Sequence, residues 1–135
     1  MTMDATALQT MVDACPFHRL LGLEVTAVDS DQGRVSLGVD LKPDFSRSDD
    51  RVELHGGVTA SLIDIAGDYA VAALIGRGVP TISLRIDYLR MGRGSRVEAT
   101  AVVRKAGRTI GTVDIEVFDD AGTLIALGRG TYSTA

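Results

Sequence analysis

Residues 55–75 read HGGVTASLIDIAGDYAVAALI, and this stretch predicts one long helix from about Gly56 to Ile75. Its small and apolar residues leave almost no polar face, which is typical of a helix that is buried on nearly all sides. Gly76 follows the last apolar residue and Pro80 comes soon after. Both are residues that end helices, so the helix is expected to stop at this point.

Strands flank this helix on both sides of the sequence. Between Arg34 and Leu41, and again between Thr81 and Tyr88, apolar and polar residues alternate with the period of a half-buried strand. The expected strands are 23–29, 34–41, 81–88, 97–103, 113–117 and 124–132, with a short helix at 5–14, a further turn at 17–21, a loop at 42–54, and turns at 106–107 and 119–122. The pattern predicts a single α+β domain over residues 1–135, in which an antiparallel sheet wraps one helix.

The composition excludes several classes of protein. The chain has 135 residues and a net charge of −4, which argues against a general nucleic-acid binder. The first ten residues have no basic and apolar leader pattern, and acids interrupt the longest apolar stretch, so no membrane span is expected. The single cysteine, Cys15, fits a reducing compartment, so a cytoplasmic location is expected.

Positive charge gathers in residues 85–108. This stretch carries a local charge of +5 and the remainder carries −9. It is either the solvated face of strands or a patch for an anionic ligand, such as the phosphates of CoA. The basic residues are Arg85, Arg90, Arg93, Arg96, Arg104, Lys105 and Arg108.

Two glycines open the long helix. Gly56 and Gly57 carry no Cβ atoms, so a ligand can approach the first free backbone N–H groups. Those N–H groups and the positive end of the helix dipole stabilise a developing oxyanion. A tight turn into the helix would explain the same two glycines.

Asp64 lies inside this helix between Ile63 and Ile65. An unpaired carboxylate in a core costs several kcal/mol, so Asp64 is either a functional acid or a paired group at a subunit interface. Asp68 is one turn later on the same face. It is interpreted either as a second site residue or as the partner of an arginine.

Other chemistry finds little support in the sequence. Two histidines and one cysteine form no pattern of metal ligands. His55 precedes the helix and is interpreted as a structural hydrogen-bonding group, with side-chain catalysis as the alternative. Ser61 lacks the setting of a serine nucleophile.

These motifs together resemble the hotdog-fold acyl-CoA thioesterases of the phenylacetate-degradation (PaaI-like) type. The resemblance covers about residues 16–134. Its most specific part is the HGG sequence of residues 55–57 followed by an acid nine residues after the histidine. Supporting matches are Phe17, Leu21-Gly22, Ser83, Tyr88-Leu89-Arg90, Gly107-Arg108, and Gly122, Ala126 and Gly128.

The resemblance implies a hotdog fold and a thioester hydrolase that releases a carboxylic acid and free CoA. It implies a homodimer, often paired into a homotetramer, with the site at the dimer interface. Gly56 would be the oxyanion donor, Asp64 of the opposite subunit the nucleophile or general base, and Ser83 a residue that positions water. Substrate contacts are expected from His55, Gly57, Asp68, Arg90, Lys105 and Arg108. No cofactor is implied, because CoA is part of the substrate.

One position departs from the family pattern. Relatives commonly have Asn or Gln about six residues before the HGG histidine, whereas this chain has Asp49. An ionised carboxylate accepts hydrogen bonds but donates none, so either Asp49 contributes to the site in an altered way, which is the prediction here, or the register of the loop differs from that of the relatives. Two alternative functions remain open: a non-catalytic acyl-CoA-binding protein, and a hotdog hydratase or dehydratase that would use His55.

Overall fold

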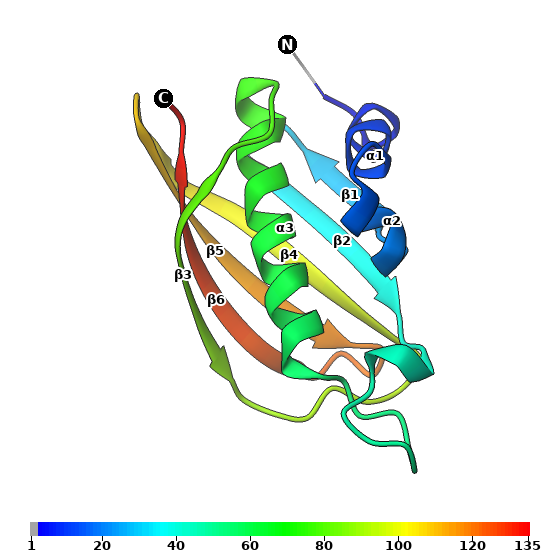
Figure 1. Cartoon of the computed structure of the whole chain (residues 1–135). Helices are drawn as coiled ribbons and strands as arrows, with labels where there is room; N and C mark the ends of the chain where they lie inside the picture. Colours follow the sequence, from blue (N-terminus) through cyan, green and yellow to red (C-terminus); the bar gives the residue numbers. More distant parts are fainter. Residues whose placement is uncertain (1–2) are drawn as a thin grey trace.

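Residues 3–135 are described by the computed structural model, which contains one antiparallel sheet wrapped around a long helix (Figure 1). The six strands are ordered β1-β2-β4-β5-β6-β3 across the sheet. This arrangement confirms the predicted fold class. The elements are α1 (Ala5–Asp13), α2 (Pro16–Leu21), β1 (Glu24–Asp29), β2 (Arg34–Asp40), η1 (Pro43–Phe45), α3 (Gly56–Ile75), β3 (Thr81–Tyr88), β4 (Arg96–Ala106), β5 (Ile110–Asp119) and β6 (Leu124–Ser133).

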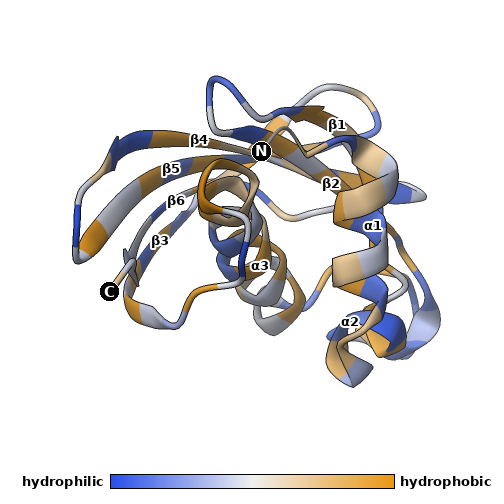
Figure 2. Ribbon diagram, turned by 90° about the horizontal axis from the view of Figure 1, so that it is seen from above, coloured by the Kyte–Doolittle hydropathy of each residue, from blue (hydrophilic) through white to orange (hydrophobic). Residues whose placement is uncertain are grey.

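Helix α3 lies in the concave face of the sheet, and α1 and α2 stand beside it near β1 and β2 (Figure 2). Its side chains pack against inward-facing aliphatic residues of the strands, including Leu37, Ala99 and Ile115. Gly76 ends the helix in the left-handed conformation, with φ 82°. The helix is long and apolar enough to cross a membrane by length and composition, but most of it is buried inside this fold.

The N-terminal helices differ slightly from the prediction. Asp4 caps α1 by accepting a hydrogen bond from the Ala7 N–H at 2.8 Å. Pro16 does more than end α1, because it occupies the first turn of α2. Proline is favoured there, since its missing N–H would have no intrahelical acceptor.

The hairpin of β4 and β5 is longer than the sequence predicted. Ala106 was expected in the turn but pairs with Gly111 as the last residue of β4. The apolar alternation stops near Val103, whereas the backbone pairing continues past the edge of the core. Backbone pairing does not require apolar side chains, so the sequence pattern underestimated these strands.

Strand β3 forms one open edge of the sheet, because among residues 3–135 it pairs with β6 alone. Most of its residues are exposed, including two large apolar ones, Ile82 at 56% and Tyr88 at 55%. Unpaired backbone groups and exposed apolar side chains make such an edge a template for pairing with another strand.

Candidate active site at the start of the long helix

Within the described residues, the first turn of α3 leaves one backbone N–H without an acceptor. His55 is the N-cap, and its Nδ1 accepts a hydrogen bond from the Gly57 N–H at 2.8 Å. The His55 carbonyl accepts from Val58 at 3.0 Å and from Thr59 at 3.4 Å. Within residues 3–135 the Gly56 N–H has no recorded acceptor. It can therefore donate to a ligand at the positive end of the helix dipole.

This geometry assigns His55 a structural role. A ring nitrogen that accepts from an N–H carries no proton, so the proton of the neutral ring is on Nε2. The Nδ1 atom is engaged in capping the helix. The interpretation of His55 as a structural hydrogen-bonding group agrees with this contact.

Tyr88 forms a wall beside Gly56. Its hydroxyl donates to the Gly56 carbonyl oxygen at 2.8 Å. A Cβ atom added at Gly56 would lie 3.3 Å from the Tyr88 ring, which is a tight contact. The absence of a side chain at Gly56 therefore keeps the approach to its N–H open.

A pocket of about 430 Å³ adjoins this helix start. Its lining is largely apolar, and two arginines contribute to it. The lining residues are Arg47, Leu54, Gly56, Thr59, Tyr88, Leu89, Arg90, Met91, Gly92 and Ile125. A largely apolar pocket with few polar groups is typical of a small-molecule site.

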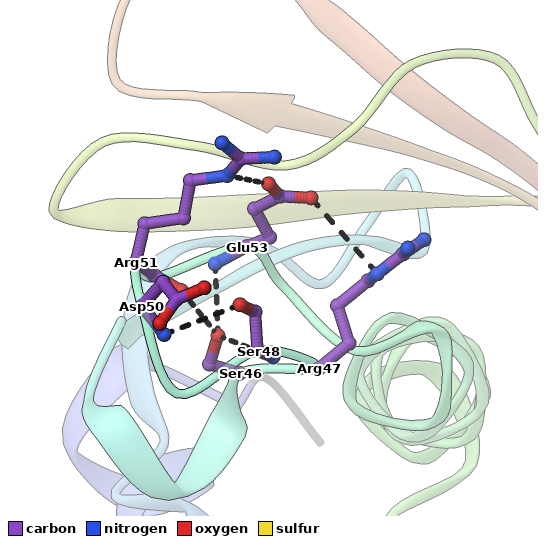
Figure 3. A network of polar contacts seen from close by, with 6 residues as sticks. All are labelled: Ser46, Arg47, Ser48, Asp50, Arg51 and Glu53. Atoms are coloured by element: carbon purple, nitrogen blue, oxygen red, sulfur yellow. Dashed lines mark hydrogen bonds and ion pairs between the residues drawn. The ribbon is translucent and has the colours of Figure 1, made fainter.

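The loop before the helix is held by a buried acid, Glu53, which lies between two arginines (Figure 3). Its carboxylate bonds to the Arg51 guanidinium and lies 3.9 Å from Arg47 Nε. The hydrogen bond from Arg51 lowers the pKa of Glu53 below its usual value. Ser46 Oγ accepts the Glu53 N–H at 3.0 Å. This network orders the loop that brings Arg47 to the pocket.

Asp64 lies two helical turns beyond Gly56. The eight residue steps from Gly56 to Asp64 span about 12 Å along the axis at the helical rise. Asp64 is only half-buried in the single chain, although a buried position was predicted. The reason is that α3 leaves this side uncovered next to the edge strand. Thr81 Oγ1 of β3 donates to Asp64 Oδ1 at 2.6 Å.

Asp68 accepts the Val79 N–H at 2.8 Å on its Oδ1 atom. No ion pair with an arginine is recorded for it among residues 3–135, so the interpretation as an arginine partner is not supported. Burial raises the pKa of Asp68 to about 6. The hydrogen bond from Val79 acts to lower this pKa, and the negative charge of Asp64 acts to raise it. Asp68 therefore fastens the connection between α3 and β3.

Replacing Asp68 with asparagine should stabilise the protein near pH 7.5 and have almost no effect near pH 4. Folding raises the pKa of Asp68, so between about pH 4 and 6 the folded state holds more protons than the unfolded state, and stability falls as pH rises. The expected gain at pH 7.5 is about 2–3 kcal/mol. Urea denaturation at both pH values measures the difference. Asp31→Asn, in an exposed turn, is the control, and an Asp68→Asn gain that is equal at both pH values would contradict this account.

The remaining predicted residues are dispersed in the single chain. Ser83 lies beside Arg85 and Asp87 over β3 and β6, on the face away from the helix, because Leu84 packs inward. Asp49 is exposed in the loop. Its side chain has no hydrogen bond or ion pair recorded within the described part of the chain.

The basic residues of the 85–108 stretch lie in different parts of the structure. Arg90 lines the pocket and donates to the Leu124 carbonyl at 3.0 Å. Lys105 and Arg108 lie at the β4–β5 hairpin, which contacts the C-terminal segment through Gly107 and Thr134. This hairpin is at the opposite end of the sheet from the start of α3 (Figure 1). Several other basic residues of 85–108 are ion-paired within the chain, namely Arg85, Arg96 and Arg104.

In residues 3–135, no cluster of three or more His, Cys, Asp or Glu could hold a metal ion.

Sequence reasoning did not identify Thr81, Tyr88, Tyr132 or Arg47 as site residues. Three of them act through a contact with a distant segment: Thr81 and Tyr132 with Asp64, and Tyr88 with Gly56. Arg47 acts within its own loop, through Glu53. The strand alternation placed Tyr88 in β3, but alternation carries no information about a hydrogen-bond partner on the helix.

Comparison with known proteins agrees with this geometry. The family described as Thioesterase superfamily matches residues 53–126. The medium/long-chain acyl-CoA thioesterase YigI of Salmonella typhimurium is 32% identical, covering 87% of this chain and 84% of its own. Human acyl-coenzyme A thioesterase 13 is also 32% identical, over 92% of this chain and 89% of its own.

A solved structure shows the same fold. The PaaI protein of Escherichia coli, from the phenylacetic acid degradation operon, superposes with a TM-score of 0.82 at 27% identity, covering 93% of this chain and 88% of its own. The matched family residues include the helix start and Asp64. The chain with this free Gly56 N–H and this helix-in-sheet fold therefore belongs to the thioesterase superfamily, as a PaaI-like member with the hotdog fold.

Proposed function

We propose that this protein is an acyl-CoA thioesterase, which hydrolyses a thioester to a carboxylic acid and free CoA. The observation that carries the proposal is the Gly56 N–H at the start of α3, which has no acceptor within residues 3–135 and adjoins a largely apolar pocket. The relatives named as acyl-CoA thioesterases support the same reaction.

In the proposed reaction the thioester carbonyl oxygen accepts the Gly56 N–H. The helix dipole and this donor stabilise the negative charge that develops on the oxygen. The Asp64 carboxylate either attacks the carbonyl carbon or takes a proton from the attacking water. The carbon–sulfur bond breaks and CoA leaves as the thiolate, which takes up a proton. If Asp64 attacks, water then hydrolyses the resulting acyl–Asp64 anhydride, which releases the carboxylic acid and regenerates the carboxylate. If Asp64 acts as a base, the water oxygen bonds to the carbonyl carbon and the proton taken by Asp64 passes to the thiolate.

The two reacting groups are too far apart on one chain to meet at one carbonyl carbon. Gly56 and Asp64 are separated by about 12 Å along α3, so the proposed site uses Asp64 of a second copy. The exposed edge of β3 supports pairing between copies. Tyr88 contacts Gly56 and Thr81 contacts Asp64. Antiparallel pairing of two β3 strands would bring the Tyr88 end of one to the Thr81 end of the other.

The rest of the substrate would extend from this point. The largely apolar walls of the pocket suit an apolar acyl chain, with Arg47 and Arg90 as cations in the lining. In a two-fold dimer, Lys105 and Arg108 of the second copy would lie toward the Gly56 end and could meet CoA phosphates. The proposal also gives Asp49 an altered role at the site and lets Ser83 help to position the attacking water. It further expects the dimers to pair into a tetramer.

The test is a hydrolysis screen over short-chain, long-chain and aryl acyl-CoAs. Release of the free CoA thiol measures the rate of hydrolysis. Turnover of at least one class is expected, together with a dimer or larger assembly in sedimentation at the assay concentration. Binding of an unreactive CoA thioether without hydrolysis of any ester would favour the binding-protein alternative. A fully active monomer would contradict the shared site.

A further inference from the structure

Asp64 is held by two hydroxyl groups that come from neighbouring strands. Thr81 Oγ1 on β3 donates to the carboxylate at 2.6 Å, and Tyr132 Oη on β6 donates to the Asp64 backbone carbonyl at 3.0 Å. Thr81 and Tyr132 are themselves register partners across the two strands. One contact therefore orients the side chain, and the other fastens the helix backbone that carries it.

The sheet is built locally to make these contacts. The register between β3 and β6 shifts between Thr81 and Ser83, and such a bulge re-aims the side chain next to it. Thr81 consequently faces the helix, although Ser83 points away from it.

Tyr132 fits between two residues that lack side chains. A Cβ atom at Gly67 or at Gly130 would collide with the Tyr132 ring or hydroxyl. Tyr132 is fully buried, and burial raises its pKa well above the usual value. Its hydroxyl therefore remains a hydrogen-bond donor throughout the pH range of a protein assay.

We propose that Thr81 is a positioning residue that orients the Asp64 carboxylate, while Tyr132 holds the helix backbone at Asp64 in place. This inference rests on the proposed function. A hydrogen bond from a hydroxyl to a carboxylate is short and strong. It restricts the Asp64 side chain to one orientation and leaves Oδ2 for the reacting centre. Correct orientation before reaction lowers the barrier without changing how tightly substrate binds.

The activity test compares Thr81→Val with Thr81→Ser. Valine keeps the shape of threonine and removes the hydroxyl, so kcat should fall by about tenfold, the scale of one hydrogen bond to a charged group. KM should stay within about twofold. Serine restores the hydroxyl and should recover most of the lost kcat. Wild-type kcat in Thr81→Val, or an equal loss in Thr81→Ser, would overturn the proposal.

A second measurement tests the contact without catalysis. Urea denaturation of Thr81→Val, Asp64→Ala and the double variant forms a double-mutant cycle for stability. A non-zero coupling between the two positions is expected, and strict additivity would overturn the proposal. An inactive wild-type protein with a coupled pair would refute the thioesterase function while leaving the Thr81–Asp64 contact established. An active protein with additive variants would support the thioesterase function and refute the Thr81–Asp64 contact.

Discussion

Replacement of Gly56 by proline is expected to lower kcat by about a hundred- to a thousandfold, the usual cost of losing one oxyanion donor. Proline removes the backbone N–H at this position and breaks no hydrogen bond within residues 3–135. The Gly56 N–H has no recorded acceptor within residues 3–135. Proline is favoured in the first turn of a helix, and His55 already has the extended conformation, φ −65° and ψ 135°, that a following proline requires.

Gly56→Ala is the matched control for this change. Alanine adds a Cβ atom 3.3 Å from the Tyr88 ring and keeps the N–H. The exposed Tyr88 side chain can shift slightly, so a loss of only a few-fold is expected. Steady-state kinetics on the best acyl-CoA of the screen measure both variants. Equal losses in the two would mean that crowding, and not the lost donor, limits the proline variant.

The Asp64→Asn variant is expected to lower kcat by about a hundredfold or more, the scale of a lost acid–base group. Asparagine keeps the size of the side chain and removes its basicity. Binding of an unreactive CoA thioether should change little, because Gly56 and the pocket remain. Calorimetry of that binding separates a loss of chemistry from a loss of affinity. Normal hydrolysis by this variant would contradict the role assigned to Asp64.

The two inactive variants together test whether the site is shared. In a mixed dimer of Gly56→Pro and Asp64→Asn chains, one of the two sites has both a normal Gly56 and a normal Asp64. Random exchange of equal amounts should therefore restore about a quarter of wild-type activity in a two-fold dimer. Recovery is measured after joint refolding or coexpression. No recovery despite formation of mixed dimers would place both groups in one subunit.

Much of the fold could be predicted because its signals are local. The continuous apolar character of residues 56–75 predicted a buried helix, and the alternation in 34–41 and 81–88 predicted half-buried strands. These periods follow from the geometry of helix and strand. Strand ends were less accurate, because pairing past Val103 continues where the apolar pattern stops.

Parts of the site were also predictable from short-range patterns. Two glycines before an apolar helix indicate an accessible helix start, and the capping contact of His55 agrees with its interpretation as a structural hydrogen-bonding group. The half-buried state of Asp64 could not be predicted, because it depends on the side of α3 that the sheet leaves uncovered. The contact of Asp68 with Val79 could not be predicted either, because the hydrogen-bond partner depends on the path of the chain after Gly76.

The sequence alone established a buried helix with a glycine start and an internal acid, because helix period, glycine content and charge are properties of neighbouring residues. The tertiary structure established which hydroxyl meets which group: Tyr88 the Gly56 carbonyl, Thr81 the Asp64 carboxylate and Tyr132 the Asp64 backbone. These contacts join residues 17 to 68 positions apart. They depend on strand register, on the bulge near Thr81 and on the space at Gly67 and Gly130, which arise only when the sheet closes around the helix.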